Sequence, residues 1–413
     1  MPGNPNVIPL QAHPRARSRD EGGAALDVVS QLFEQAGRDA ALPAVVRAEI
    51  ARLRIATLRL AQLAPGFLVQ RMHPARRLLD AIGAAALGLD ESAQAEDATV
   101  HAIATAVHAV LSDFDADPAP FENTAAALEE FLVQRTREED ESARPLIQAI
   151  VQRETADLPR RAAQEEVERR LGARLWVPPA VRAMLRGPWV AALAMEYRQY
   201  GEGSVQWHAR VRTMDELLWS VEPKASAEGR RRLAAVLPDL VEAIAAGLQR
   251  SEVPADELDL FLSSLVDSHA QAMKAGQRGL VLVPEPAPAE PPSTVFCAET
   301  FDAGARRVEE IRLAAARGGA PDGCDEAVAR LRAGAWIEIQ RGARAAACKR
   351  LVWSSPITGA LLFAGLASGS IGVSIMPAAL AEKMRGGEAS ILDATPLVER
   401  MLLALAAAPR PQG

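Results

Sequence analysis

Apolar residues recur every three or four positions through most of the first 280 residues, a spacing typical of amphipathic helices. In 43–62, for example, Val46, Ile50, Leu53 and Leu60 lie on one helical stripe. The same pattern predicts helices at 74–89, 99–112, 121–132, 138–172, 181–200, 213–219, 233–248 and 256–274. A multi-helix, all-α body is therefore expected over 24–280, preceded by a flexible tail at 1–23.

The pattern changes after a proline-rich stretch, which we interpret as a semi-rigid linker over 281–295. Five of the nine residues in 284–292 are proline. Apolar and polar residues then alternate in 335–340 and 347–353, as in β-strands. Shorter strands are predicted at 358–364, 372–376 and 390–393, and helices at 303–317, 325–332, 377–386 and 397–407. The chain is thus predicted to be mostly α, with a small α+β domain at 296–413 that contains a β-barrel or a curled sheet.

One uncharged stretch, 351–381, is long enough to suggest a membrane-spanning helix. Its interior carries two prolines, four glycines and several serines, which are typical of short buried strands joined by turns. No membrane span is therefore expected.

Composition narrows the class of protein. Hydrophobic residues make up 49% of the chain but aromatic residues only 4%, so the surplus is aliphatic, which favours helices and a folded core. The net charge of -7 argues against generic nucleic-acid binding. Three widely spaced cysteines give neither a disulfide framework nor a zinc site, and no secretory signal opens the chain. A cytoplasmic protein is expected.

His73-Pro74-Ala75-Arg76-Arg77 is one candidate for ligand chemistry. A histidine and arginines at a helix start could hold an anion. Alternatively, Pro74 begins a helix and the charges only solvate its outer face, the interpretation that we favour. His73 and Arg76 are therefore weak candidates for binding an anionic ligand.

A second candidate is the group of cations around the predicted hairpin, namely Arg341, Arg344, Lys349 and Arg350. Arginines could hold phosphate groups bidentately. Alternatively, they protect the edge of a sheet from unwanted strand pairing, the interpretation that we favour.

No metal site or cofactor is expected. The acidic run that begins at Asp113 resembles a calcium loop, but Pro118 and Thr124 occupy the positions of its glycine and its bidentate glutamate. His101 and His108 are seven residues apart, too far along a helix to share one ion. Phosphate-binding loops, nucleophile elbows and zinc-protease motifs are missing from the sequence, so no catalytic residues are proposed.

Several short segments together resemble a large bacterial family of unknown function, whose members are often labelled thymidine phosphorylase. In order they are Leu42-Pro43, His73-Pro74-Ala75-Arg76, Pro188-Trp189, Leu217-Leu218-Trp219-Ser220-Val221-x-Pro223, Gly334-x-Trp336-Ile337-Glu338 and Lys349-x-Leu351-x-Trp353-x-Ser355-Pro356. The resemblance implies a C-terminal part similar to PilZ-like β-barrels, which typically bind cyclic di-GMP.

The residues that would carry those activities are missing. From Phe296 onward there is no Arg-x-x-x-Arg, and Ser368-x-Ser370-x-Gly372 lacks the acid or amide of the second PilZ motif. The lysine–histidine–serine stretch of the phosphorylases is also absent. We therefore expect a non-enzymatic regulatory or adaptor protein that binds a protein partner or itself. The alternatives are a cyclic di-GMP effector, a self-associating helical module and, least favoured, a nucleoside-acting enzyme.

Overall fold

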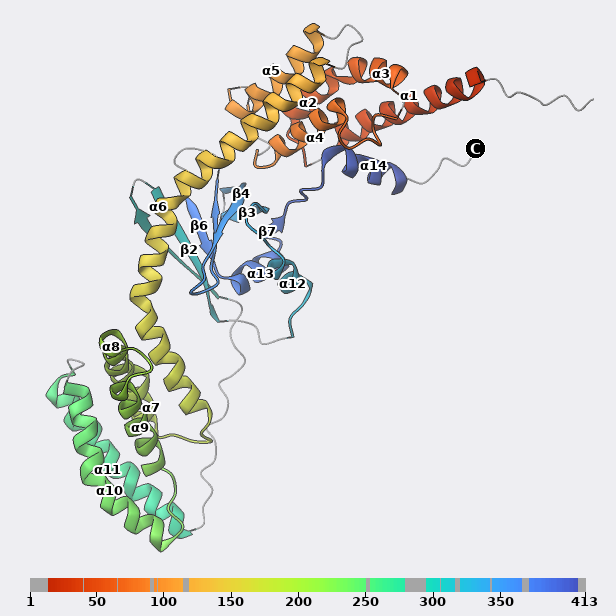
Figure 1. Ribbon diagram of the computed structural model, residues 1–413. Coiled ribbons are helices and arrows are strands. Elements are labelled where there is room, and N and C mark those ends of the chain that lie inside the picture. Colours follow the sequence, from red (N-terminus) through yellow and green to blue (C-terminus); the bar gives the residue numbers. More distant parts are fainter. Residues whose placement is uncertain are drawn as a thin grey trace, which may run out of the picture. The chain divides into compact units, whose positions relative to one another are not determined.

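The computed structural model describes most of the 413 residues, in the ranges 14–39, 41–64, 66–89, 93–94, 96–113, 119–249, 253–278, 295–304, 306–315, 320–341, 344–365 and 371–407 (Figure 1). The chain forms two compact units. Unit 1 combines Met1–Gln148 with Pro292–Gly413, and unit 2 is Ala149–Pro291. The expected helical body is therefore shared between the units, while most of the expected linker, 281–294, lies outside the described residues.

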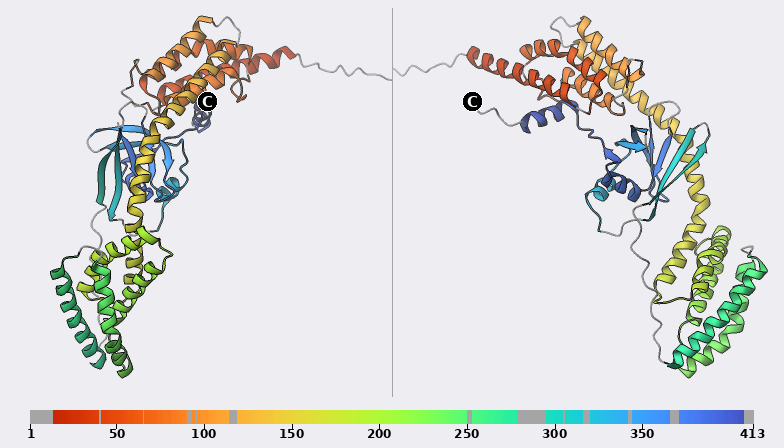
Figure 2. Two further views of the ribbon diagram at one scale, coloured as in Figure 1. Left: turned by 60° about the vertical axis from the view of Figure 1, so that its left-hand side comes forward. Right: turned by 180° about the vertical axis from the view of Figure 1, so that it is seen from behind.

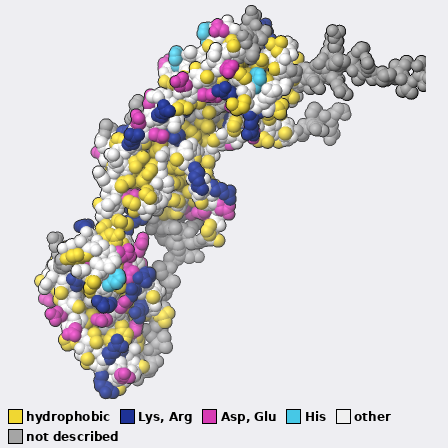
Figure 3. Space-filling model, viewed as in Figure 1, with side chains coloured by type: hydrophobic (Ala, Val, Ile, Leu, Met, Phe, Trp, Pro, Cys, Tyr) yellow, Lys and Arg dark blue, Asp and Glu magenta, His cyan; other side chains and the backbone are white. Residues whose placement is uncertain are grey.

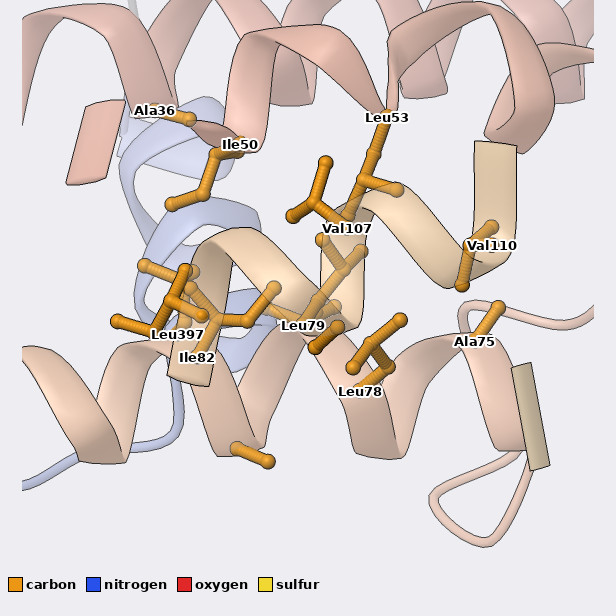
Figure 4. Close-up of a cluster of buried hydrophobic side chains, with 14 of the residues drawn as sticks. Ala36, Ile50, Leu53, Ala75, Leu78, Leu79, Ile82, Val107, Val110 and Leu397 are labelled. Atoms are coloured by element: carbon orange, nitrogen blue, oxygen red, sulfur yellow. The ribbon is translucent and has the colours of Figure 1, made fainter. Parts of the chain in front are cut away.

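The first part of unit 1 is a helical bundle. It contains α1 (Pro14–Arg38), α2 (Ala44–Arg52), α3 (Arg54–Leu63), α4 (Pro74–Ala86), α5 (Ala98–Asp113), the first turns of α6 (Ala119–Gly172) and α14 (Leu397–Ala407). These elements share one hydrophobic core, in which Leu397 of α14 lies beside Ile82 of α4 (Figure 4). The last helix of the chain thus completes the core of the first bundle. Helix α1 begins at Pro14, inside the segment expected to be a flexible tail.

Three contacts hold α14 on the bundle. A Cβ atom added at Gly83 of α4 would lie 2.6 Å from Leu397 Cβ, so only glycine permits this approach. The backbone N–H of Val398 donates a 2.9 Å hydrogen bond to Asp80, which satisfies one of the free donors at the start of α14. Arg400 forms an ion pair with Asp39 at 2.7 Å.

The rest of unit 1 is built on a seven-stranded sheet with the order β1-β2-β6-β5-β4-β3-β7. The strands are β1 (Val295–Ala303), β2 (Arg306–Ala315), β3 (Trp336–Arg341), β4 (Arg344–Ser354), β5 (Leu361–Ala364), β6 (Gly372–Ile375) and β7 (Ala389–Ile391). All neighbours are antiparallel except β2 and β6. The expected barrel is wrong, because β1 and β7 are the two edges of an open sheet and do not pair with each other.

Both faces of this sheet are covered by helices (Figure 1). On one face Leu361, Phe363 and Val373 pack with α12 (Gly323–Ala329) and α13 (Pro377–Arg385). On the other face Gly372 approaches Leu146 of α6. The result is a helix–sheet–helix arrangement, which Figure 2 shows from two further sides.

The helix predicted at 303–317 is wrong, because this segment forms the β1–β2 hairpin. Strand β2 lies between β1 and β6, with Val308 buried on the α6 face and Ile311 in the core beside α13. Burial on both faces produces an apolar spacing of three, which imitates helical periodicity.

The other helices and strands predicted between 325 and 407 are confirmed, with bounds that differ by a few residues. The alternating segments at 335–340 and 347–353 lie in β3 and β4, and the helices predicted at 377–386 and 397–407 are α13 and α14. Within the uncharged stretch, the described residues include β5, β6 and the start of α13. In the part of the chain that the structure describes, we find no helix with the length and apolarity needed to span a bilayer.

Unit 2 consists of helices around a second hydrophobic core. Besides the end of α6, it contains α7 (Pro179–Met184), a π-helical turn η1 (Leu185–Trp189), α8 (Val190–Tyr200), α9 (Val205–Ser220), α10 (Ala227–Gln249) and α11 (Ala255–Arg278). Trp189 is completely buried and packs on Gly247, where an added Cβ would lie 2.9 Å from the indole ring. Trp189 is therefore a packing anchor of unit 2.

The close approach of α4 and α14 predicts the sign of one substitution. Gly→Ala in an ordinary helix interior stabilises it by roughly 1 kcal/mol. We expect Gly83→Ala instead to lower the free energy of unfolding of unit 1 by about 1–3 kcal/mol, because the methyl group overlaps Leu397. Gly37→Ala on α1, where an added Cβ meets nothing within 4 Å, is the matched control and should be neutral or stabilising. Denaturant unfolding measures both, and equal effects would contradict the prediction.

Candidate functional site

The His73–Arg76 segment forms the start of α4 and binds other parts of the protein. His73 is the N-cap residue, and its Nδ1 accepts a 3.3 Å hydrogen bond from the backbone N–H of Ala75. Partial burial lowers the pKa of His73, which favours the neutral ring that can accept this bond. Pro74 occupies the first turn, as expected.

Arg76 is only 5% exposed and links three segments of the bundle. Its guanidinium donates a 2.5 Å hydrogen bond to the Leu68 carbonyl and lies 3.5 Å from Asp80 and 4.0 Å from Glu399 of α14. Burial raises the pKa of Asp80, while the N–H of Val398 and the charge of Arg76 act to lower it. The expectation of charges on a solvated outer face therefore does not describe Arg76, which is buried and joins α14 to the bundle.

Two of the four cations around the β3–β4 hairpin have described side chains, and both are buried. Lys349 donates a 2.8 Å hydrogen bond to the Ile371 carbonyl. Arg350, only 8% exposed, points to the opposite face of β4, where Nε lies 2.7 Å from Glu139 of α6 and Nη2 pairs with Asp140. The side chains of Arg341 and Arg344 lie outside the described residues.

Arg350 belongs to a network of charges between β4 and α6. Glu139 also lies 3.5 Å from Arg135, whose guanidinium donates a 3.1 Å hydrogen bond to Thr99 of α5. Burial lowers the pKa of Arg135, and the nearby charges of Glu139 and Asp97 oppose that shift. The network connects the sheet to α6 and α6 to the bundle. Arg350 has its partners in this network, and Lys349 has the Ile371 carbonyl, so both cations already have partners within the protein.

We predict that this network matters for stability. Removing one member of a buried ion pair typically costs about 3–5 kcal/mol, because the remaining charge is left unpaired. Arg350→Met should lower the free energy of unfolding by about 3 kcal/mol, the lower end of that range, because Glu139 keeps its longer 3.5 Å contact with Arg135. Arg330→Met is the control, because its pair with Glu326 has side-chain exposures of 77% and 64% and should cost less than about 1 kcal/mol. Similar losses for both variants in denaturant unfolding would show that the buried network contributes little.

Unit 2 contains a buried group of polar side chains at the end of α9. His269 of α11, 7% exposed, forms a 2.9 Å hydrogen bond with the Ser220 hydroxyl, which also donates to the Leu217 carbonyl at 2.7 Å. Lys224 lies 4.4 Å above the Trp219 ring and donates to the carbonyls of Trp219 and Glu222. These contacts complete the last turn of α9, where carbonyl groups lack helical partners.

A serine and a histidine at 2.9 Å also have the geometry of a nucleophile and its base. Ser220 is completely buried, however, so a substrate cannot reach its hydroxyl in this conformation. Burial first, and then the charge of Lys224, lower the pKa of His269. The interactions are those expected of a neutral histidine that stabilises the α9–α11 contact.

The pKa shift of His269 predicts a pH dependence of stability. Because the folded state holds the pKa below its ordinary value of 6.5, the unfolded state binds a proton more readily. The contribution of His269 is therefore complete above about pH 6.5 and falls as the pH drops toward the lowered pKa. We expect His269→Gln to lose less stability than the wild type between about pH 7.5 and pH 5. His208→Gln, an exposed histidine of the same unit, should keep the wild-type dependence in thermal unfolding.

Among the described residues of unit 1, α5 and the first turns of α6 border an open groove of about 840 Å³. Its walls are mainly small side chains, with Phe131 and Leu128 among the few large ones. The residues that line it include Ala98, His101, Ala102, Thr105, Ala109, Asp113 and Ala127. Figure 3 shows one face of the bundle, where apolar, acidic, basic and histidine side chains are mixed.

The groove was not among the sites predicted from the sequence. The signal was present, because Ala98, Ala102, Thr105 and Ala109 recur at three- and four-residue intervals on α5. Small residues at that spacing also suit a helix that faces the protein core, so the pattern alone does not identify an open groove.

Within the described ranges, no three His, Cys, Asp or Glu side chains are arranged to hold a metal ion. The loop after Asp113, in which the calcium-like acidic run continues, lies outside them. His101 and His108 are both exposed on α5. Of the two, only His101 lines the groove.

Comparison with protein families gives two matches that together cover more than half of the chain. Residues 8–117 match the second domain of a protein of unknown function (DUF1631), and residues 149–266 match the third domain of the same family. Neither description mentions a PilZ domain or a thymidine phosphorylase. No curated protein and no solved structure matches the chain.

Proposed function

The chain belongs to the DUF1631 family of proteins of unknown function, and from this premise we propose that it is a non-enzymatic regulatory or adaptor protein. Its partner is an α-helix of another protein chain, which binds in the groove between α5 and α6. The groove is the one observation on which the proposal depends. The bound helix presents small side chains, such as alanine, serine and threonine, along its docking face.

The shape of the groove supports a helical partner. Helix axes pack 8–10 Å apart, and the distance depends on the size of the side chains at the contact. Ala102, Thr105 and Ala109 on α5 face Ala127 across the groove, so a third helix can approach both walls closely. Buried Leu128 and half-buried Phe131 add apolar surface to the groove, which favours desolvation on binding.

The contacts of the other candidate groups favour binding over catalysis. Ser220 and His269 are buried in the helical core of unit 2. Lys349 and Arg350 are bonded within the sheet and to α6. An anionic nucleotide would have to displace these partners. We therefore favour an adaptor that binds protein through the α5–α6 groove over a cyclic di-GMP effector.

Photo-crosslinking at two neighbouring positions tests the proposal. Ala127 lines the groove, whereas Ala126 is exposed on α6 outside it. Benzoylphenylalanine at position 127, in cells that express the protein natively, should form an adduct whose partner peptide is helical and rich in small residues. The same group at position 126 should not form that adduct. If irradiation gives no adduct specific to position 127, the groove is not a docking site and the proposal is wrong.

A further inference from the structure

We propose that the helix received by the groove is α5 of a second copy of the chain, packed antiparallel about a two-fold axis. This inference rests on the proposed function, because it uses the same groove and names its occupant. Helix α5 itself carries small side chains along one face. The same surface can therefore form the groove on one copy and the bound helix on the other, which is the requirement for a two-fold symmetric contact.

The charges at the groove are self-complementary in one orientation only. His101 and Asp113 both line it, are exposed and lie twelve residues apart on α5, roughly 18 Å along the helix at 1.5 Å per residue. In an antiparallel pair centred near residue 107, each His101 faces Asp113 of the other copy. The imidazole can then donate a hydrogen bond to the carboxylate, and the two-fold symmetry repeats this contact on the other side of the interface. A parallel pair would instead place the two Asp113 carboxylates together, which is unfavourable.

The helix dipole points to the same orientation. Asp113 is the last residue of α5, where the partial negative charge of the helix end disfavours a carboxylate. His101 is on the second turn, near the positive end, where a protonated imidazole gains nothing. In an antiparallel pair each of these side chains lies beside the oppositely charged end of the neighbouring helix. The second copy therefore stabilises two positions that α5 alone does not.

Sedimentation equilibrium of the purified full chain tests this inference. We expect a reversible dimer, with Ala127→Arg weakening the dissociation constant by at least about tenfold, because it places a charge in an apolar contact. Ala126→Arg makes the same change on the adjacent, outward position and should leave association unchanged. Circular dichroism checks that both variants are folded. A monomer at a protein concentration of roughly 100 µM would overturn the inference, as would equal effects of the two substitutions.

Exchanging the charges tests the orientation and does not depend on the alanine variants. His101→Asp and Asp113→Arg should each weaken the dimer, because the first places two carboxylates opposite one another and the second removes the acceptor of the His101 N–H. The double variant restores opposite charges in the antiparallel pair and should recover wild-type association. In a parallel pair the double variant would stay weak, and that result would overturn the arrangement. A monomeric protein that still forms the 127-specific adduct with a different protein would refute the second copy alone and leave the proposed function standing.

Discussion

The contact between Gly83 and Leu397 is the constraint on which the architecture of unit 1 depends. It brings the last helix of the chain against the fourth, within a distance that only a glycine allows. Asp80 satisfies a free N–H at the start of α14, and Arg76 and Asp39 provide charges for Glu399 and Arg400. Because α14 completes the core of the first bundle, the segment 295–391 that contains the sheet must end close to that bundle. Unit 1 is therefore discontinuous in sequence, with all of unit 2 inserted between its two parts.

Side chains that resemble a ligand site in the sequence instead bind other parts of the fold. A buried cation is costly unless it is paired and hydrogen-bonded. Arg76 has the Leu68 carbonyl and two carboxylates, and Arg350 has Glu139 and Asp140. Lys224, which directly follows the family-like segment at the end of α9, obeys the same rule and donates to the carbonyls of Trp219 in that helix and of Glu222 just beyond it. The short polar motifs of this largely aliphatic chain are thus explained by two structural roles. They satisfy the free groups at helix ends, and they join one helix or strand to another.

The groove between α5 and α6 is different, because its small side chains are not covered by another described element of the bundle. Alanine side chains are small, so each one adds little buried apolar surface. For the same reason they let a third helix approach α5 and α6 closely. Their combination with His101 at one end of α5 and Asp113 at the other gives the surface a direction. The groove therefore supports the proposed docking function, and the positions of His101 and Asp113 support the antiparallel orientation of the bound helix.

The sequence by itself determined most of the local structure. Helical periodicity, prolines and paired glycines depend on neighbouring residues, so α13, α14 and the strands at 336–341 and 344–354 could be located without a structure. Only the tertiary structure decided that 306–315 is a strand covered on both faces, that the sheet stays open and that α14 returns to the first bundle. It also decided that Arg76 and Arg350 are buried and that an open groove lies beside α5. The physical reason is that pairing, burial and charge neutralisation are set by partners as far as 361 residues away, such as Asp39 and Arg400, whose proximity no local pattern encodes.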